Sequence, residues 1–366
     1  MDGLAEARIL LPGVRLDTAE LLMGSDRTEV RRVRARWPET RATSVIVKRY
    51  ISAGEGWTRE AAALASLPDH APAPRLVAEG ATPPLVVMSD VGPAHTVADA
   101  LLGTNPDDAT AAVLEWAEAM ADLHVATLGA RARFRAELAL RAGDLPVSDH
   151  VMPTVVDETA LLLEARCTEL GVAIPSGALR ELRELPRTLR ADVDAAALSP
   201  SDSCPDDNVR TSGGVVLVDF EGAQWRHVVW DVAYLTVPWA SCWCAWRMPS
   251  DVVERAVEHY RARVEAALPY VRTPQFRQDL AAATSGWALI SAASLLPDAL
   301  GADPRPANPR KITPARRAMI LHRLDRARRN PDLHALARFA GLLRAALVDR
   351  WGEVPLALAP AFDQQT

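Results

Sequence analysis

The sequence predicts an α+β protein in two lobes, a small N-terminal mixed β-sheet lobe and a large, mainly helical C-terminal lobe. Three observations predict this fold class: β-branched and apolar runs lie near the N-terminus, apolar residues recur at helical spacing through most of the remainder, and a Gly-Pro break separates the two regions. The 366 residues suffice for two domains of ordinary size. We expect the lobes to cover residues 1–91 and 92–366.

Strands and turns dominate the N-terminal region. Residues 21–36 mix apolar and charged side chains around a Gly-Ser-Asp turn, which indicates a hairpin. The β-branched run 44–50 and the apolar run 85–88 are typical of further strands. Between them, the Ala-rich segment 58–67 predicts a helix that Thr58 caps.

A hinge and a series of helices follow. Ser, Asp, Val, Gly and Pro at 89–93 indicate the hinge. Apolar residues at helical spacing predict helices at 107–128, 157–172, 176–195, 251–268, 274–298, 313–329 and 333–350. The proline-rich segment 304–309 predicts a long exposed loop.

Composition excludes several classes of protein. No run reaches the 18 or so consecutive apolar residues of a membrane span, and the net charge of −6 argues against nucleic-acid binding. The acidic N-terminus lacks the layout of a secretory signal. Four cysteines in so long a chain do not make a disulfide scaffold, so we expect a cytoplasmic protein with no membrane or nucleic-acid partner. The sequence leaves the oligomeric state open.

The cysteines allow two interpretations. Cys242 and Cys244, with Cys204, could form a metal cluster. Zinc sites, however, favour two or more residues between paired cysteines, and this sequence has only one between Cys242 and Cys244. We therefore favour buried cysteines packed with tryptophans in a helical core.

The most informative segment is an acidic loop ahead of a short strand. Asp202, Asp206, Asp207 and Asn208 precede an apolar run that ends at Asp219. The spacing from Asp202 to Asp219 suits a loop, a short strand, a turn at 212–214 and a second strand. Oxygen donors of this kind are the ligands that Mg²⁺ prefers. Phosphoryl transfer also needs a carboxylate that receives a hydroxyl proton. The pattern therefore predicts a kinase of small molecules.

This segment resembles the aminoglycoside phosphotransferase and choline kinase family, whose members are relatives of the protein kinases. Pro200-Ser201-Asp202 stands where the family has His-Gly-Asp, and Leu217-Val218-Asp219-Phe220 matches the family's apolar-Asp-Phe segment. The resemblance implies a protein-kinase-like fold, with Asp202 as the catalytic base and Asp219 as the principal metal ligand. The family's Asn falls at Asp207, one place before Asn208, so either could be the second ligand, and we favour Asn208.

The resemblance also implies ATP and Mg²⁺ as cofactors. Lys48 would reach the nucleotide phosphates, and Glu60 would hold Lys48 in place. The strand and hinge at Met88 and Asp90 would lie against the adenine. Asp231 would be structural, as an N-cap that bonds to backbone near the catalytic loop.

The resemblance leaves the acceptor and the activity open. The acceptor could be an aminoglycoside-like amino sugar, another small alcohol or a hydroxyl on a peptide. Pro200, Ser201 and Asp207 depart from the family pattern, so the alternative is a catalytically impaired pseudokinase that binds a nucleotide or a protein. Glu221 could orient groups around the site, but we favour its interpretation as a solvated turn carboxylate.

Overall fold

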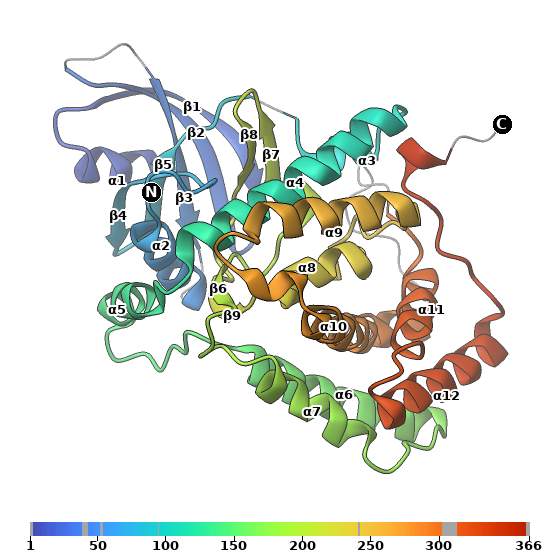
Figure 1. Cartoon of the computed structure of the whole chain (residues 1–366). Coiled ribbons are helices and arrows are strands. Elements are labelled where there is room, and N and C mark those ends of the chain that lie inside the picture. Colours follow the sequence, from blue (N-terminus) through green and yellow to red (C-terminus); the bar gives the residue numbers. More distant parts are fainter. Residues whose placement is uncertain are drawn as a thin grey trace.

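The computed structural model describes residues 3–38, 43–51, 54–93, 95–240, 242–301 and 313–363. The predicted loop at 304–309 lies outside these ranges. Figure 1 shows a sheet at one side of the molecule and a large group of helices at the other, as the sequence predicted.

The N-terminal lobe is built on a five-stranded sheet in the order β1-β2-β3-β5-β4. Every neighbouring pair is antiparallel, so the sheet is not mixed in strand direction. The strands are β1 (Arg15–Gly24), β2 (Thr28–Arg36), β3 (Thr43–Tyr50), β4 (Leu76–Ala81) and β5 (Pro84–Ser89). The predicted hairpin is confirmed as β1 and β2, and the two predicted strands as β3 and β5.

Alternation along β5 gives the sheet two apolar faces. Leu85 and Val87 pack with Val45, Val47 and helix α1 (Gly3–Leu10) on one face. Their neighbours along the strand, residues 86 and 88, join the core of helix α2 on the other face. Successive side chains of a strand point to opposite faces, so one continuous apolar run serves both helices.

Helix α2 (Glu55–Ser66) begins earlier than the sequence predicted. Gly54 is its N-cap, and Thr58 is a buried residue within the helix, so the predicted Thr58 cap is wrong. Two contacts stabilise the added turn. The indole N–H of Trp57 donates to the Leu85 carbonyl at 3.2 Å, and Glu55 accepts from Arg59 one turn later at 2.9 Å.

The C-terminal lobe is mainly helical. Each predicted helix is present with shifted ends, the helix start expected at Asp231 is α8, and α3 and α5 were not predicted. The helices are α3 (Val97–Leu101), α4 (Pro106–Thr127), α5 (Arg131–Ala142), α6 (Met152–Leu170), α7 (Ala178–Thr188), α8 (Val229–Thr236), α9 (Ser250–Val264), α10 (Pro274–Leu300), α11 (Arg316–Ala327) and α12 (His334–Trp351). Helix α5 escaped prediction because only Phe134, Leu138 and Ala142 form its buried face.

Helix α10 is long and apolar enough to cross a membrane, judged by length and composition alone. In this structure it packs against α6, α8 and α11, and most of its apolar stretch is buried. A helix in the core of a large protein is also apolar on most sides.

Two short antiparallel strand pairs lie between α7 and α8. One pairs β6 (Ala196–Ser199) with β9 (Gln224–His227), and the other pairs β7 (Asn208–Thr211) with β8 (Gly214–Leu217). The second is the hairpin that the sequence predicted. Its pairing is continued by the Val218 N–H, which donates to the Asp207 carbonyl at 2.9 Å. This pairing brings the acidic loop beside the residues that follow β8.

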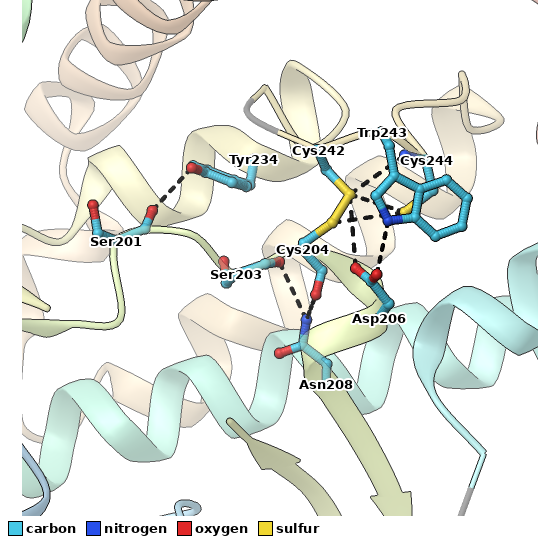
Figure 2. Close-up of a disulfide and its surroundings, with 9 residues drawn as sticks. All are labelled: Ser201, Ser203, Cys204, Asp206, Asn208, Tyr234, Cys242, Trp243 and Cys244. Atoms are coloured by element: carbon cyan, nitrogen blue, oxygen red, sulfur yellow. Dashed lines mark hydrogen bonds between the residues drawn. A yellow bond between two sulfur atoms is a disulfide. The ribbon is translucent and has the colours of Figure 1, made fainter. Parts of the chain in front are cut away.

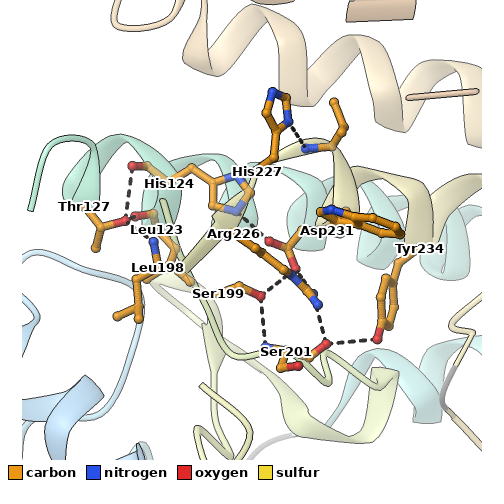
Figure 3. A network of polar contacts seen from close by, with 12 residues as sticks. Leu123, His124, Thr127, Leu198, Ser199, Ser201, Arg226, His227, Asp231 and Tyr234 are labelled. Atoms are coloured by element: carbon orange, nitrogen blue, oxygen red, sulfur yellow. Dashed lines mark hydrogen bonds and ion pairs between the residues drawn. The ribbon is translucent and has the colours of Figure 1, made fainter. Parts of the chain in front are cut away.

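A buried ionic network holds the loop that carries Asp202 (Figure 3). The Asp231 carboxylate on α8 accepts hydrogen bonds from Arg226 and, at 2.7 Å, from Ser199. It also contacts the His124 ring at 3.1 Å. Burial alone would raise the pKa of Asp231, but the charges of Arg226 and His124 lower this pKa to about 2. The predicted N-cap role is wrong, because Val228 is the N-cap and the Asp231 carboxylate binds side chains instead.

The same network reaches the loop backbone. The Ser201 carbonyl accepts from Arg226 at 3.0 Å and from the Tyr234 hydroxyl at 2.9 Å, while the Ser201 N–H donates to Ser199 at 2.9 Å. Ser201 has a φ of 75°, in the left-handed region that favours glycine. These three hydrogen bonds fix a backbone conformation that serine alone would seldom adopt.

We expect Asp231→Asn to lower the free energy of unfolding by about 3–5 kcal/mol, because Arg226 would remain charged and buried without a carboxylate. Urea unfolding at neutral pH measures this loss. Asp122→Asn is the matched control, since Asp122 pairs with Arg263 at 2.6 Å on the exposed surface. A loss no larger than that of the control would show that the network does not stabilise the loop.

Candidate functional site

Lys48 is the centre of the candidate site. It lies near the end of β3 and is buried, and its Nζ contacts Glu60 Oε2 at 2.9 Å and Asp219 Oδ1 at 2.6 Å. Burial would lower the pKa of Lys48, but Glu60, Asp219 and Glu221 together hold it well above its usual value. The amine is therefore charged at neutral pH.

Glu60 links three segments that are distant in the sequence. It projects from α2, and its Oε2 accepts from the Tyr50 hydroxyl as well as contacting Lys48. Its Oε1 accepts from the Phe220 N–H at 3.1 Å. Both carboxylate oxygens are thus occupied, and the side chain fixes Lys48 relative to the segment after β8.

Glu221 also belongs to the site, so its interpretation as a solvated turn carboxylate is wrong. Its Oε2 lies 3.2 Å from Lys48 Nζ, and its side chain is 26% exposed. Asp219 adopts a φ of 64°, which turns the chain sharply after β8. Phe220, which separates Asp219 and Glu221 in the sequence, is buried. The carboxylates of Asp219 and Glu221 both contact Lys48. The alternation of acidic and apolar residues at 219–221 was the signal available in the sequence.

The acidic loop forms a group of carboxylates near Asp219. Burial raises the pKa of Asp207 to about 9, and the charges of Asp219, Asp206 and Asp202 add to this effect. Asp202 itself is exposed, on the loop after β6. The ionised forms of these side chains therefore disfavour one another.

Asn208 is buried at the start of β7 with its amide orientation fixed. Figure 2 shows its amide nitrogen directed at the carbonyls of Ser203 and Cys204, to which it donates, at 3.2 Å in the case of Ser203. Its Oδ1 has no hydrogen-bond partner within the described part of the chain. A buried oxygen without a partner is unfavourable unless a ligand satisfies it.

A cavity of about 610 Å³ connects these groups. Its wall includes Lys48, Glu60, Met88, Asp90, Asp206, Asp207 and Asp219, together with Leu22, Met23, Val30, Ile46, Val209 and Val218. Most predicted site residues thus border one space between the sheet lobe and the acidic loop. Asn208 lies beside Asp207 but is not part of the wall, and neither is Asp202.

Met88 and Asp90 take different positions in the hinge. Met88 is buried and borders the cavity. The Asp90 carboxylate accepts from Arg32 at 2.7 Å, from Ser44 at 2.5 Å and from the Gly92 N–H at 2.9 Å. Asp90 therefore shapes the hinge through its own contacts. The predicted lobe boundary at residue 91 falls within this connection.

A larger cavity of about 780 Å³ lies elsewhere, along α5 to α7. Arginines are prominent among its lining residues, including Arg131, Arg180 and Arg183. The residues that line it include none of those predicted from the sequence as site residues. The smaller cavity is therefore the candidate site.

Comparisons with known proteins found similar solved structures. No family model and no curated protein matches the sequence. An ethanolamine kinase from Plasmodium vivax matches with a TM-score of 0.51 at 12% identity, over 88% of this chain and 83% of that one. A choline/ethanolamine kinase family protein from Mesorhizobium loti matches with a TM-score of 0.49 at 16% identity, over 90% and 93% of the two chains. An aminoglycoside phosphotransferase mutant solved with ADP and hygromycin B matches with a TM-score of 0.48 at 12% identity, over 92% and 96%. The match to the ethanolamine kinase shows that the chain has the two-lobed, protein-kinase-like fold, as its sequence predicted.

Proposed function

We propose that this protein is an Mg²⁺- and ATP-dependent phosphotransferase that acts on a hydroxyl group of a small molecule. The observation that carries the proposal is the buried, charged Lys48 held by Glu60 and Asp219 on the wall of the cavity. A buried ammonium with fixed carboxylates is a pre-organised binding group for phosphate. Its position at the end of the sheet lobe is the one that kinase-like phosphotransfer needs.

Lys48 binds the α and β phosphates of the nucleotide in this proposal, and Glu60 keeps its amine in place. The adenine lies against the apolar part of the cavity, between Ile46 and Met88, near the hinge. Asp90 stabilises the hinge through Arg32 and Ser44. The volume of about 610 Å³ is within the range usual for small-molecule sites.

The donor set fits Mg²⁺. Asp219, with Asn208 or Asp207, supplies oxygen ligands, and Asn208 Oδ1 is a buried acceptor without a partner in the described structure. The crowded carboxylates have surplus negative charge that a divalent cation would offset. Bound Mg²⁺ supplies charge neutralisation to the β and γ phosphates.

Asp202 is the catalytic base in this proposal. It accepts the proton of the acceptor hydroxyl while that oxygen attacks the γ phosphorus. The family's His-Gly pair is absent before Asp202, and the hydrogen bonds of Ser201 to Ser199, Arg226 and Tyr234 hold the loop instead. Pre-organisation of the loop positions Asp202 without cost at the moment of reaction.

The second candidate function is a nucleotide- or protein-binding module without catalysis. Pro200, Ser201 and Asp207 are the residues that favour it, because they depart from the family pattern before the proposed base and at the proposed metal ligand. The acceptor of an active enzyme could be an aminoglycoside-like amino sugar, another small alcohol or a peptide hydroxyl.

One experiment separates the two functions. Thermal unfolding is measured with ATP, with and without Mg²⁺, and ADP release is then measured across a panel of amino sugars, other alcohols and hydroxyl-bearing peptides. A phosphotransferase gives Mg²⁺-dependent stabilisation and acceptor-dependent ADP release. Stabilisation by ATP without any ADP release favours the nucleotide-binding module. No response to ATP contradicts both the phosphotransferase and the nucleotide-binding module.

We expect Asp219→Ala to lower the rate of acceptor-dependent ADP release by at least about 100-fold while the protein stays folded. The reason is that the substitution removes a proposed ligand of the Mg²⁺ ion that would stabilise the charge of the transition state. Asp144→Ala is the control, since Asp144 is an exposed residue after α5. Circular dichroism verifies the fold of both variants. Turnover that survives the Asp219 substitution would rule out the metal assignment.

We expect stability to depend on pH through Asp207. Its folded-state pKa of about 9 lies above the unfolded value of about 4, so the folded chain holds an extra proton between these values. The stability contributed by protonated Asp207 is present in full below about pH 4 and is lost progressively up to about pH 9. Asp207→Asn cannot titrate and should lack this loss.

Urea midpoints from pH 5 to pH 10, measured with a chelator present, test this expectation. The wild-type protein should lose stability relative to Asp207→Asn as the pH rises, and the difference should level off above about pH 9. Parallel pH profiles for the two proteins would show that Asp207 is not held protonated by its neighbours.

A further inference from the structure

Three sulfur atoms and a carboxylate meet beside the acidic loop (Figure 2). Cys204 and Cys242 are joined as a disulfide. Cys244 Sγ lies 3.0 Å from Cys242 Sγ and 3.9 Å from Cys204 Sγ, and Asp206 Oδ1 lies 4.0 Å from Cys242 Sγ. One ligand atom from each of the four residues falls within a span of 4.8 Å.

These cysteines are buried in the core of the large lobe with tryptophans packed against it, as the sequence predicted, but they do not lie on helices. Cys204 lies in the loop just before the 3-10 helix η1 (Pro205–Asp207), and Cys242 and Cys244 lie in irregular backbone between α8 and α9. Irregular backbone can bring side chains together at spacings that a helix forbids. The single residue between Cys242 and Cys244 is therefore compatible with two sulfurs in one cluster.

We propose that, in the reduced protein, Cys204, Cys242, Cys244 and Asp206 bind one Zn²⁺ ion. A disulfide accounts for two of the three sulfurs, whereas a metal ion accounts for all three and for the carboxylate. Zn²⁺ takes thiolate and carboxylate ligands in a tetrahedral arrangement, and structural sites have four protein ligands. This proposal does not rest on the phosphotransferase function.

The distances suit a tetrahedral ion once the disulfide is reduced. Zn–S bonds of about 2.3 Å place ligand sulfurs about 3.8 Å apart. The 3.9 Å between Cys204 and Cys244 already meets this value. The other two sulfur pairs are closer and need to separate, which cleavage of the Cys204–Cys242 bond allows.

Neighbouring groups orient the ligands. The Trp243 indole N–H donates to Asp206 Oδ2 at 2.7 Å, while Oδ1 lies on the side of Cys242. The Cys244 backbone N–H donates to Cys242 Sγ at 3.4 Å, which favours the thiolate form. Hydrogen bonds of this kind fix the ligands and tune the affinity of metal sites.

Burial and softness select the metal. All three sulfurs are buried, with Cys244 at 0% exposure. Thiolates favour zinc over Mg²⁺, which prefers the oxygen donors around Asp219. The two sites are therefore chemically distinct, although Asp206 and Asp207 are adjacent. A bound zinc would tie η1, which carries Asp207, to the segment after α8.

The chemistry balances in two steps. Two equivalents of a thiol reductant convert the disulfide to two thiols and are themselves oxidised to a disulfide. Zn²⁺ then displaces three protons, one from each cysteine thiol, and binds the Asp206 carboxylate. Binding is therefore weaker at low pH and in oxidising conditions.

Cys244→Ser tests the proposal, because it removes one ligand and leaves the Cys204–Cys242 pair intact. Cys167→Ser is the matched control, since Cys167 is a buried cysteine on α6 outside the cluster. The full-length proteins are reduced, freed of metal with a chelator and titrated anaerobically with Zn²⁺ against a chromogenic chelator. Thermal unfolding verifies that each variant is folded.

We expect one Zn²⁺ per chain for the wild type and Cys167→Ser. We expect at least about tenfold weaker binding by Cys244→Ser, because even changes outside the ligand set weaken metal sites about 10- to 100-fold. Co²⁺ substitution should give the absorption of a tetrahedral thiolate complex in the wild type. The same substitution in Cys244→Ser should not give this absorption.

Equal zinc affinity for the wild type and Cys244→Ser would overturn the proposal. So would wild-type protein purified anaerobically that contains no zinc, takes up none after reduction, and shows two titratable thiols instead of four before reduction. That result would identify the cluster as a structural disulfide. Both readouts are independent of ADP release, so they do not depend on whether the protein is a kinase.

Discussion

The burial of one ammonium group organises this molecule. Lys48 can be buried and charged only because carboxylates from α2 and from the segment after β8 surround its amine. Glu60 comes from the sheet lobe, whereas Asp219 and Glu221 come from the large lobe. The requirement that a buried charge be paired therefore joins the two lobes at the place where the cavity opens.

The large lobe contains a second buried charge. Arg226 is wholly buried, and Asp231 neutralises it while accepting from Ser199. This pair fixes the backbone of Ser201, next to Asp202. Buried charged side chains thus hold one side of the loop that carries the proposed base, whereas the other side of the loop faces solvent. Stability and the proposed chemistry depend on the same few residues.

The sulfur cluster constrains the other end of that loop. Cys204 and Asp206 precede Asp207 directly, and their partners come from the segment after α8. The acidic loop is therefore restrained at Ser201 by hydrogen bonds and at Cys204 by sulfur. Burial, and then the neighbouring carboxylates, raise the pKa of Asp207, and such restraint keeps these side chains together.

Local patterns in the sequence determined the strands β3 and β5, the long helices and the hairpin between Asp202 and Asp219. Each of these depends on apolar periodicity or a turn within a few neighbouring residues. The positions of Lys48 on a strand and Glu60 on the following helix were predictable for the same reason, together with the family resemblance.

Tertiary structure alone decided which charges and sulfurs meet. Glu221 contacts Lys48, Asp90 is taken up by Arg32 and Ser44, and Cys204 reaches Cys242. Each of these pairs is far apart in the chain, and no periodicity records the distance between them. Burial supplies the reason for the charges, because polar groups excluded from water must find partners wherever the fold brings them.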